Sequence, residues 1–226
     1  APLLMVHGGA GAGKSTVIDC IAQWMQRILQ QAGDNPDQPY VVKVAFTGTA
    51  AANIEGHTMH GVFAFAFGDK HYSLSDKTRD RKRVAMTNIL LVIIDEVSMV
   101  KADMLYMMDL RLQEIKEKVG VAFGGVAVMA FGDMMQLKPC MGQFICEEPD
   151  SPEFKATHAL NPRWKMFSSI LLEKNHRQGK DKQYADMLNR IRNGNHTKED
   201  MEELQLRVRP ENHPDVVSAE IGRAHV

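Results

Sequence analysis

The chain has 226 residues, of which 44% are hydrophobic and 24% charged, and its formal net charge is -1 at pH 7. This composition is typical of globular domains with enough apolar material for a core. No apolar stretch is long enough to span a membrane, so we expect no membrane segment. A net charge near zero speaks neither for nor against nucleic acid, because any basic surface would have to be local.

The three cysteines, Cys20, Cys140 and Cys146, are odd in number and lack the pairing of metal ligands. This usage is typical of reduced thiols in an intracellular protein. The first residues already have the pattern of a buried strand, so no signal or transit segment is visible.

Apolar runs and helical spacing alternate along the chain. Short runs rich in Val, Ile, Leu or Phe predict strands at 3–7, 41–46, 90–94 and 126–131, with a further strand near 169–172. Helical spacing predicts helices at 14–31, 77–87, 101–118, 182–192 and 198–206. This order indicates an α/β fold with a doubly wound parallel sheet, whose ligand sites lie at the carboxyl ends of the strands.

A glycine-rich segment, HGGAGAGKST at 7–16, separates the first predicted strand from the first helix. Gly8, Gly13, Lys14 and Ser15 fit the phosphate-loop pattern G-x-x-x-x-G-K-[ST]. Loop amides and the helix N-terminus would bind the polyphosphate of ATP or GTP. The expected nucleotide-binding residues are Gly9, Ala10, Gly11, Ala12, Gly13, Lys14, Ser15 and Thr16. Lys14 would neutralise the β- and γ-phosphates and the Ser15 hydroxyl would hold magnesium. A glycine-rich turn without ligand is the alternative.

Two carboxylates follow the apolar run at 91–94. Asp95 is expected to hold the magnesium ion that bridges the phosphates. Glu96 could accept a proton from the attacking water, an arrangement that suits ATP hydrolysis. The alternative is an acidic pair that caps the following turn.

A second strand runs into polar residues at 131–139, FGDMMQLKP. Gln136 could report the γ-phosphate to the rest of the protein, and Asp133 could support the magnesium site. A plain strand-to-turn connection is the alternative.

The segment TGTAAANIEGHTMHG at 47–61 follows the second predicted strand. Its small residues and hydroxyls let a polymer backbone approach closely, and helix N-terminal amides could take a phosphate. Phe63, Phe65 and Phe67 alternate just beyond it, which favours an apolar strand over a base-stacking surface. His57 and His60 are not expected to bind a metal, because no cysteine or acidic cluster accompanies them.

Two further cationic features have a structural and a functional interpretation. The run DKTRDRKR at 76–83 is locally basic, which favours a solvated helix face over a contact with a nucleic-acid backbone. Arg177 follows the last predicted strand. An arginine brought from a neighbouring domain can stabilise charge on the γ-phosphate, although a surface arginine is the alternative.

Taken in order, these segments resemble the motifs of superfamily-one DNA helicases of the PIF (petite integration frequency) and RecD-like group. GGAGAGKST resembles motif I, TGTAAANIEGHTMHG motif Ia, IIDEVSM motif II and FGDMMQLKP motif III. The helix at 104–118 with AFGG at 122–125 is similar to the segment that marks the PIF family. The residues after 172 are similar to motif IV and the helices that follow it.

The resemblance implies two RecA-like domains with ATP between them and 5′-to-3′ movement on single-stranded DNA. By matching position, Lys14 and Ser15 would bind phosphate and magnesium, Asp95 would bind the metal, and Glu96 would activate water. The resemblance makes Gln136 the γ-phosphate sensor and Arg177 the arginine finger. The residues that lie in the DNA-contacting motif are Thr47, Gly48, His57, Thr58 and His60.

The sequence also departs from the family pattern. Glu55 and Met134 replace a frequent small residue and a frequent Phe, and nothing in the chain resembles motifs V and VI. We therefore expect one complete RecA-like domain at 1–168, the start of a second at 169–208, and a connector with a non-native tail at 209–226.

The function predicted from this resemblance is an ATP-dependent 5′-to-3′ DNA helicase, represented by a fragment. It would act on single-stranded and duplex DNA as a monomer, in DNA repair, recombination or telomere and genome maintenance, in the nucleus or mitochondrion if the source is eukaryotic. Two alternatives remain open: a Helitron-type transposon helicase, and a module that binds nucleotide and DNA without unwinding.

Overall fold

A computed structural model describes residues 1–35, 38–66, 71–174, 182–206 and 208. The chain divides into two compact units, Ala1–Arg177 and Gln178–Val226. Within the described ranges, no helix is long and apolar enough to cross a membrane. The three cysteines are exposed and form no disulfide.

The first unit is built on a parallel sheet of six strands, in the order β3-β2-β4-β5-β1-β6. The strands are β1 (Leu3–Gly8), β2 (Val41–Ala45), β3 (His57–Thr58), β4 (Leu91–Asp95), β5 (Ala127–Gly132) and β6 (Ser168–Leu172). In the registers, Met5 of β1 lies opposite Ala130 of β5, and Ile93 of β4 lies opposite Met129. Parallel strands need crossover connections, and here these are helical. The predicted α/β fold with a parallel sheet is confirmed.

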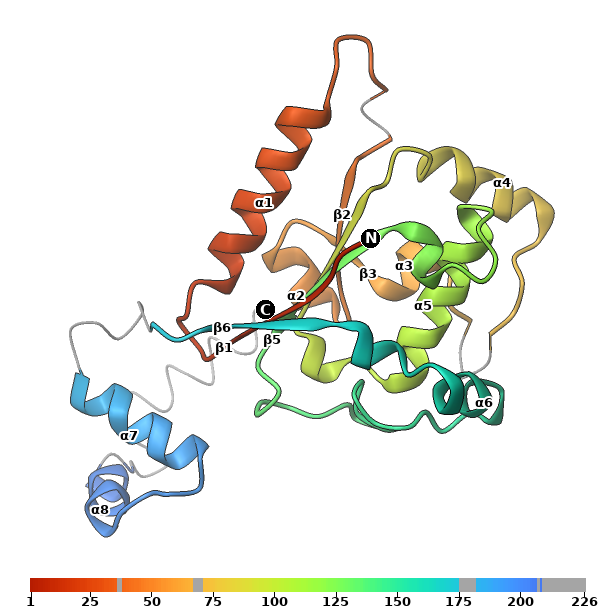
Figure 1. Ribbon diagram of the computed structural model, residues 1–226. Coiled ribbons are helices and arrows are strands. Elements are labelled where there is room, and N and C mark those ends of the chain that lie inside the picture. The colour runs from red at the N-terminus through yellow and green to blue at the C-terminus, as the bar shows by residue number, and fades with distance from the viewer. Residues whose placement is uncertain (36–37, 67–70, 175–181, 207, 209–226) are drawn as a thin grey trace. The chain divides into compact units, whose positions relative to one another are not determined.

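Helices cover both faces of the sheet (Figure 1). Those of the first unit are α1 (Lys14–Leu29), α2 (Gly48–Asn53), α3 (Met59–Phe63), α4 (Asp76–Ala85), α5 (Ala102–Ile115) and α6 (Pro152–Leu160). Three short 3-10 turns, η1 (Val97–Met99), η2 (Ala122–Gly125) and η3 (Arg163–Met166), join them to the strands.

Alternate residues of the strands feed two separate hydrophobic clusters. Ile93 packs with Ile18 and Ala22 of α1, whereas its neighbour Ile94 packs with Leu105 and other residues of α5. This alternation follows from the strand period of two residues. Because both faces are covered, β4 is buried along its whole length.

The predicted strands agree with the observed ones to within one residue at each end. The sequence also predicts an alternating strand through Phe63, Phe65 and Phe67, and this prediction is wrong for the described residues. Phe63 is the last residue of α3, and Ala64 turns the chain with a φ of 50°. Phe63 and Phe65 stack on each other at 5.6 Å, and Phe63 is buried in the α5 cluster. Phe67 lies outside the described residues.

The strand β6 corrects the domain boundary predicted after residue 168. It pairs in parallel with β1 from Leu4↔Ser168 to Gly8↔Leu172, so it is the edge strand of the first sheet. Short apolar strands look alike in sequence, and only their pairing shows which sheet they join.

The second unit contains α7 (Lys182–Arg192) and α8 (Lys198–Leu206), at the bounds predicted from helical spacing. Arg190 of α7 donates two hydrogen bonds to Asp200 of α8, at 2.8 and 2.5 Å. The Arg190 guanidinium lowers the pKa of the Asp200 carboxyl far below its usual value. The predicted tail at 209–226 lies outside the described residues.

The turn η2 packs tightly against α5 and generates a stability prediction. Gly124 has a φ of +61°, and a Cβ atom there would lie 2.5 Å from the carbonyl oxygen of Leu112. Gly120 also has a positive φ, of +80°, but a Cβ atom there would meet nothing within 4 Å. Both Gly→Ala changes carry the positive-φ cost of about 1–2 kcal/mol. We expect Gly124→Ala to lower the free energy of unfolding in urea by a further ~1–3 kcal/mol. Equal losses in the two variants would contradict the close packing of η2.

Candidate nucleotide-binding site

The chemistry-bearing segments meet where neighbouring strands end. Gly8 ends β1, Asp95 ends β4 and Gly132 ends β5, all at the carboxyl edge of the sheet. The loop after Gly8 leads into α1 at Gly13, the residue before the helix, which adopts a φ of 86°. Gly8 itself permits the close return of the loop, since a Cβ atom there would lie 2.9 Å from the Cβ atom of Ala12.

These segments enclose a cavity of about 540 Å³ at the start of α1. Its lining comes from the glycine loop, the two carboxylates after β4 and the amide after β5: Ala10, Gly11, Ala12, Gly13, Lys14, Ser15, Thr16, Asp95, Glu96 and Gln136. Of the residues predicted for nucleotide binding, only Gly9 is outside this lining. The fold thus brings together residues separated by more than a hundred positions in the sequence.

The Lys14 side chain folds back over the glycine loop. Its Nζ atom donates hydrogen bonds to the carbonyl oxygens of Gly8 at 2.8 Å and Gly9 at 3.2 Å. These contacts place the ammonium group over the glycine loop, at the wall of the cavity. A compact cation in this place suits the charge of a polyphosphate.

Asp95 and Glu96 have different environments although they are adjacent. Asp95 is only 7% exposed. Burial raises the pKa of Asp95, the backbone hydrogen bond with Glu96 and the nearby Lys14 charge lower it, and the Glu96 charge raises it. Glu96 is half-buried and has a φ of 50°, an uncommon backbone conformation for a non-glycine residue. Such conformations often occur at functional sites.

The donor set of the cavity fits magnesium. The Ser15 hydroxyl and the Asp95 carboxylate supply oxygen, the ligand that Mg²⁺ prefers, and a desolvated carboxylate is stabilised by a cation. In the part of the chain that the structure describes, no group of three or more His, Cys, Asp or Glu could hold a metal by itself. Two protein oxygens with nucleotide phosphates and water would match the way proteins usually bind Mg²⁺.

Asp133 shapes the turn that carries Gln136. It is 3% exposed, and its carboxylate accepts hydrogen bonds from the Met135 amide at 3.1 Å and the Gln136 side chain at 3.4 Å. Asp133 is outside the cavity lining, and its hydrogen bond with the Gln136 side chain connects it to that lining. His7, near the end of β1, is a titratable residue close to this turn that no sequence pattern singles out. Burial lowers the pKa of its imidazole, and the nearby Asp133 charge offsets part of this shift.

The candidate DNA-contacting residues lie around β3, the edge strand at the other end of the strand order from β6. Pairing of β2 with β3 places Thr58 opposite Ala45. Thr47 and Thr58 cap α2 and α3, because their hydroxyls accept hydrogen bonds from the amides of Ala50 and Gly61, each at 3.2 Å. The remaining candidates, Gly48, His57 and His60, are exposed. The His60 ring lies 6.0 Å from Phe46 and 5.8 Å from Phe65.

The basic run on α4 is partly engaged within the domain. Arg79 pairs with Asp76 at 2.6 Å and Arg83 with Glu117 at 2.9 Å. Lys82 donates to two carbonyl oxygens of α3, at 2.9 and 2.6 Å. These contacts agree with the interpretation of the run as a helix face. Arg177 lies outside the described residues.

A glycine loop between the first strand and helix, with a metal-binding carboxylate on a nearby parallel strand, defines a RecA-like phosphate-loop NTPase domain. The chain matches the model of the PIF1-like helicase family over residues 1–202. It belongs to that family.

Relatives of this chain are much longer proteins. It is 30% identical over 218 residues to the ATP-dependent DNA helicase PIF1 of Saccharomyces cerevisiae (strain YJM789), covering 95% of this chain and 24% of that protein. It is 31% identical over 192 residues to the ATP-dependent DNA helicase RRM3 of Saccharomyces cerevisiae (strain ATCC 204508 / S288c), covering 83% of this chain and 24% of that protein. The chain thus spans about a quarter of these relatives.

Solved structures of the family superpose on this one. The crystal structure of Pif1 helicase from Candida albicans matches with a TM-score of 0.70 at 27% identity, over 94% of this chain and 45% of that chain. Pif1 helicase from Bacteroides in complex with ADP-AlF3 and ssDNA matches with a TM-score of 0.68 at 28% identity, over 95% and 48%.

The burial of Asp95 generates a prediction about stability. Its pKa is higher in the folded protein than in the unfolded chain, so the unfolded chain binds fewer protons between the two values. The free energy of unfolding therefore falls as the pH rises through that window, and the charged carboxylate destabilises the fold at neutral pH. We expect Asp95→Asn to raise the Tm at pH 7 by about 2–4 °C, a change that corresponds to roughly 1 kcal/mol for a chain of this size.

Thermal unfolding without nucleotide measures this effect. Asp80→Asn is the matched control, because Asp80 is exposed and we expect no change of Tm. A lower Tm for Asp95→Asn would contradict the assigned cost of burial.

Proposed function

We propose that the chain is the nucleotide-binding domain of an ATP-dependent DNA helicase that moves 5′-to-3′ on single-stranded DNA. The observation that carries this proposal is the single cavity shared by the glycine loop, Asp95, Glu96 and Gln136. Binding of a nucleotide needs only the loop, whereas hydrolysis needs a base and a sensor within reach of the same phosphates. The complexes of Pif1 from Bacteroides with ADP-AlF3 and with ADP-AlF4 support ATP as the nucleotide.

The residues of the cavity divide the work of hydrolysis. Loop amides and the Lys14 ammonium bind and orient the phosphates. Ser15 and Asp95 would hold magnesium, which would supply charge neutralisation on the phosphate oxygens. Glu96 accepts the proton of the attacking water. Gln136 contacts the γ-phosphate and, through its bond to Asp133, links that contact to the end of β5.

The exposed edge at β3 is the proposed track for single-stranded DNA. Helix N-termini at Gly48 and Met59 present amides, and the exposed His57 and His60 offer polar edges and ring faces. The Bacteroides Pif1 structures with ssDNA, and one of DNA unwinding at forked dsDNA, support single-stranded and duplex DNA as partners.

A second lobe would complete the ATP site. We assign residues 178–208 to the start of a second RecA-like domain and Arg177 to the arginine finger, on the resemblance of this region to motif IV. The chain spans 24% of the yeast relatives, and this coverage favours a second candidate function for the isolated chain: nucleotide and DNA binding without unwinding. Robust strand separation by the purified 226 residues would exclude that candidate.

The proposed cellular role is DNA repair, recombination or genome maintenance by a monomer in the nucleus or mitochondrion. A Helitron-type transposon origin is the competing assignment. A replication-initiator nuclease domain upstream in the full gene would support the transposon, and its absence from the complete gene would support the cellular helicase.

Substitutions in the cavity test the division of work. In the protein that carries both lobes, we expect Lys14→Ala to abolish ATP hydrolysis and weaken ATP binding, because the phosphates lose their cation. Glu96→Gln should retain binding and lower kcat by about 10²–10⁴-fold, the usual contribution of a general base. Steady-state hydrolysis and titration with a fluorescent ATP analogue measure the two effects.

The matched controls are Lys77→Ala and Glu153→Gln, which change exposed residues outside the cavity. Hydrolysis by Glu96→Gln at the parent rate would show that Glu96 is not the base.

The DNA track is tested at His57, an exposed residue on β3. Loss of one stacking or polar contact with a base or phosphate should weaken the binding of oligo-dT about 5–100-fold in His57→Ala. Fluorescence anisotropy at fixed salt measures the affinity. His196→Ala, an exposed histidine of the second unit, should bind as the parent does, and equal binding by both variants would exclude His57 from the track.

A further inference from the structure

Buried polar side chains line one face of α5, the helix that follows the two carboxylates of the cavity. They are Asp103, Tyr106, Asp109 and Gln113, with exposed fractions of 1%, 2%, 1% and 6%. Spacings of three and four residues place side chains on the same side of a helix. We call these four residues the polar face of α5. Unpaired polar groups in such a place would be costly, so their partners indicate what this face holds.

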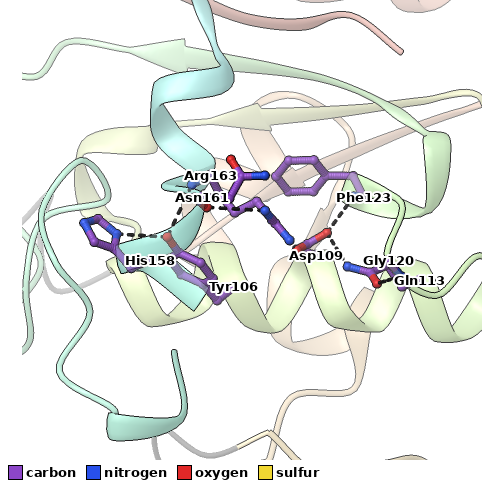
Figure 2. Close-up of polar contacts among 8 residues, drawn as sticks. All are labelled: Tyr106, Asp109, Gln113, Gly120, Phe123, His158, Asn161 and Arg163. Carbon is purple, nitrogen blue, oxygen red and sulfur yellow. Dashed lines mark hydrogen bonds and ion pairs between the residues drawn. The ribbon is translucent and has the colours of Figure 1, made fainter. Parts of the chain in front are cut away.

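Asp109 is the centre of the contacts shown in Figure 2. Its carboxylate accepts hydrogen bonds from Arg163 Nε at 2.5 Å, Gln113 Nε2 at 2.9 Å and the Phe123 amide at 2.6 Å. One carboxylate thus binds η3, through Arg163, and η2, through Phe123, to the same helix. The charges are paired and the oxygens satisfied, which a buried ion pair requires.

Tyr106 makes the second attachment of η3. Its hydroxyl oxygen accepts a hydrogen bond from the Arg163 amide at 3.2 Å and lies 2.9 Å from His158 Nδ1. Because the amide can only donate, the single hydroxyl proton is free to point to the histidine. The Tyr106 ring also stacks on Phe154 at 5.8 Å. Arg163 is therefore held at its backbone by Tyr106 and at its guanidinium by Asp109.

Asp103 attaches the segment that comes before. Its two carboxylate oxygens accept hydrogen bonds from the Asp150 and Ser151 amides, each at 2.9 Å. One residue earlier, the Ala102 amide donates to the Gln143 carbonyl at 3.1 Å. The chain that leaves Gln136 is thus bound to α5 from residue 143 to residue 163.

The strand β6 depends on these attachments more than the other strands do. It comes just after η3, and within the described ranges it pairs with β1 alone. Its residues from Ser168 to Leu171 are exposed. Few buried apolar contacts therefore hold its side chains, and an edge strand has only one pairing partner. The end of β6 at Leu172 precedes Arg177 by five residues in the sequence.

We propose that Tyr106, Asp109 and Arg163 are positioning residues for ATP hydrolysis. By fixing η3 on α5, they set the place of β6 beside β1, the strand that leads into the phosphate loop. The same helix begins six residues after Glu96, so α5 connects the proposed base of the reaction to η3 and β6. The catalytic part of this proposal rests on the proposed function.

The variant Tyr106→Phe tests the proposal with the least disturbance, because the ring can still stack on Phe154. In the protein that carries both lobes, we expect the kcat of DNA-stimulated ATP hydrolysis to fall about fivefold to tenfold, the effect of roughly one lost hydrogen bond in the network. The KM for ATP should not change, since no residue of the cavity is altered. Tyr40→Phe is the matched control, because its hydroxyl donates to Asp34, at 2.9 Å, away from the cavity and the polar face of α5, and kcat should stay at the parent value.

Hydrogen–deuterium exchange provides a readout that does not need catalysis. In the 226-residue chain, Tyr106→Phe should speed exchange of the amides at 163–172 at least about threefold and leave those of β4 and β5 unchanged, because opening of the edge would be local. Arg163→Lys keeps the charge but loses the Nε contact, and should change exchange in the same segment.

The outcomes separate this inference from the proposed function. If the parent protein lacks DNA-stimulated ATP hydrolysis, the proposed function fails, and the exchange of β6 still decides whether the network positions that strand. Unchanged kcat and unchanged exchange in Tyr106→Phe would overturn the inference. Equal acceleration across the whole sheet, with a matching loss of Tm, would show general destabilisation and would also overturn it.

Discussion

The parallel pairing of β5 with β1 on one side and with β4 on the other brings the chemistry of this chain to one place. Each strand ends at the same edge of the sheet, so the glycine loop after β1, the carboxylates after β4 and the amide after β5 line one cavity. Antiparallel pairing of any of them would send one segment to the opposite edge. The helical crossovers that parallel strands require also bury both faces of the sheet. A buried edge of this kind desolvates Asp95, and a carboxylate without water binds a cation more strongly.

The helix α5, which follows the carboxylates at that edge, is bound to segments that come later in the chain. Its apolar residues, such as Leu105, pack against the sheet, while its polar face holds η2, η3 and the chain before α6. Apolar side chains in place of this polar face could fill the same volume. Buried ion pairs add little to stability, so stability alone does not explain the polar face. What the hydrogen bonds of Asp109 provide is direction, because a carboxylate binds a guanidinium and an amide only in particular orientations. The connection from the ATP site to β6 therefore runs through contacts with defined geometry.

The threonines of the candidate DNA track show how one side chain can serve both fold and ligand. Thr47 and Thr58 each use the hydroxyl oxygen to accept a hydrogen bond from an amide of the helix that follows. A hydroxyl also carries one proton, so the same side chain can donate to a phosphate oxygen. A helix cap therefore does not compete with a backbone contact, and the small residues between the two caps keep the surface open for a polymer.

The sequence alone predicted five of the six described strands, five of the eight described helices and the cavity residues, because period, glycine spacing and charged residues after apolar runs are local signals. Lys14, Asp95, Glu96 and Gln136 were all identifiable in this way. The sequence did not predict the two-residue strand β3 or the short helices α2, α3 and α6. Tertiary structure alone decided what depends on distant partners. Phe63 closes a helix because its ring packs on α5, and β6 belongs to the first sheet because its backbone pairs with β1. Asp109 and Arg163 are 54 residues apart, and neither has a local pattern that predicts the other.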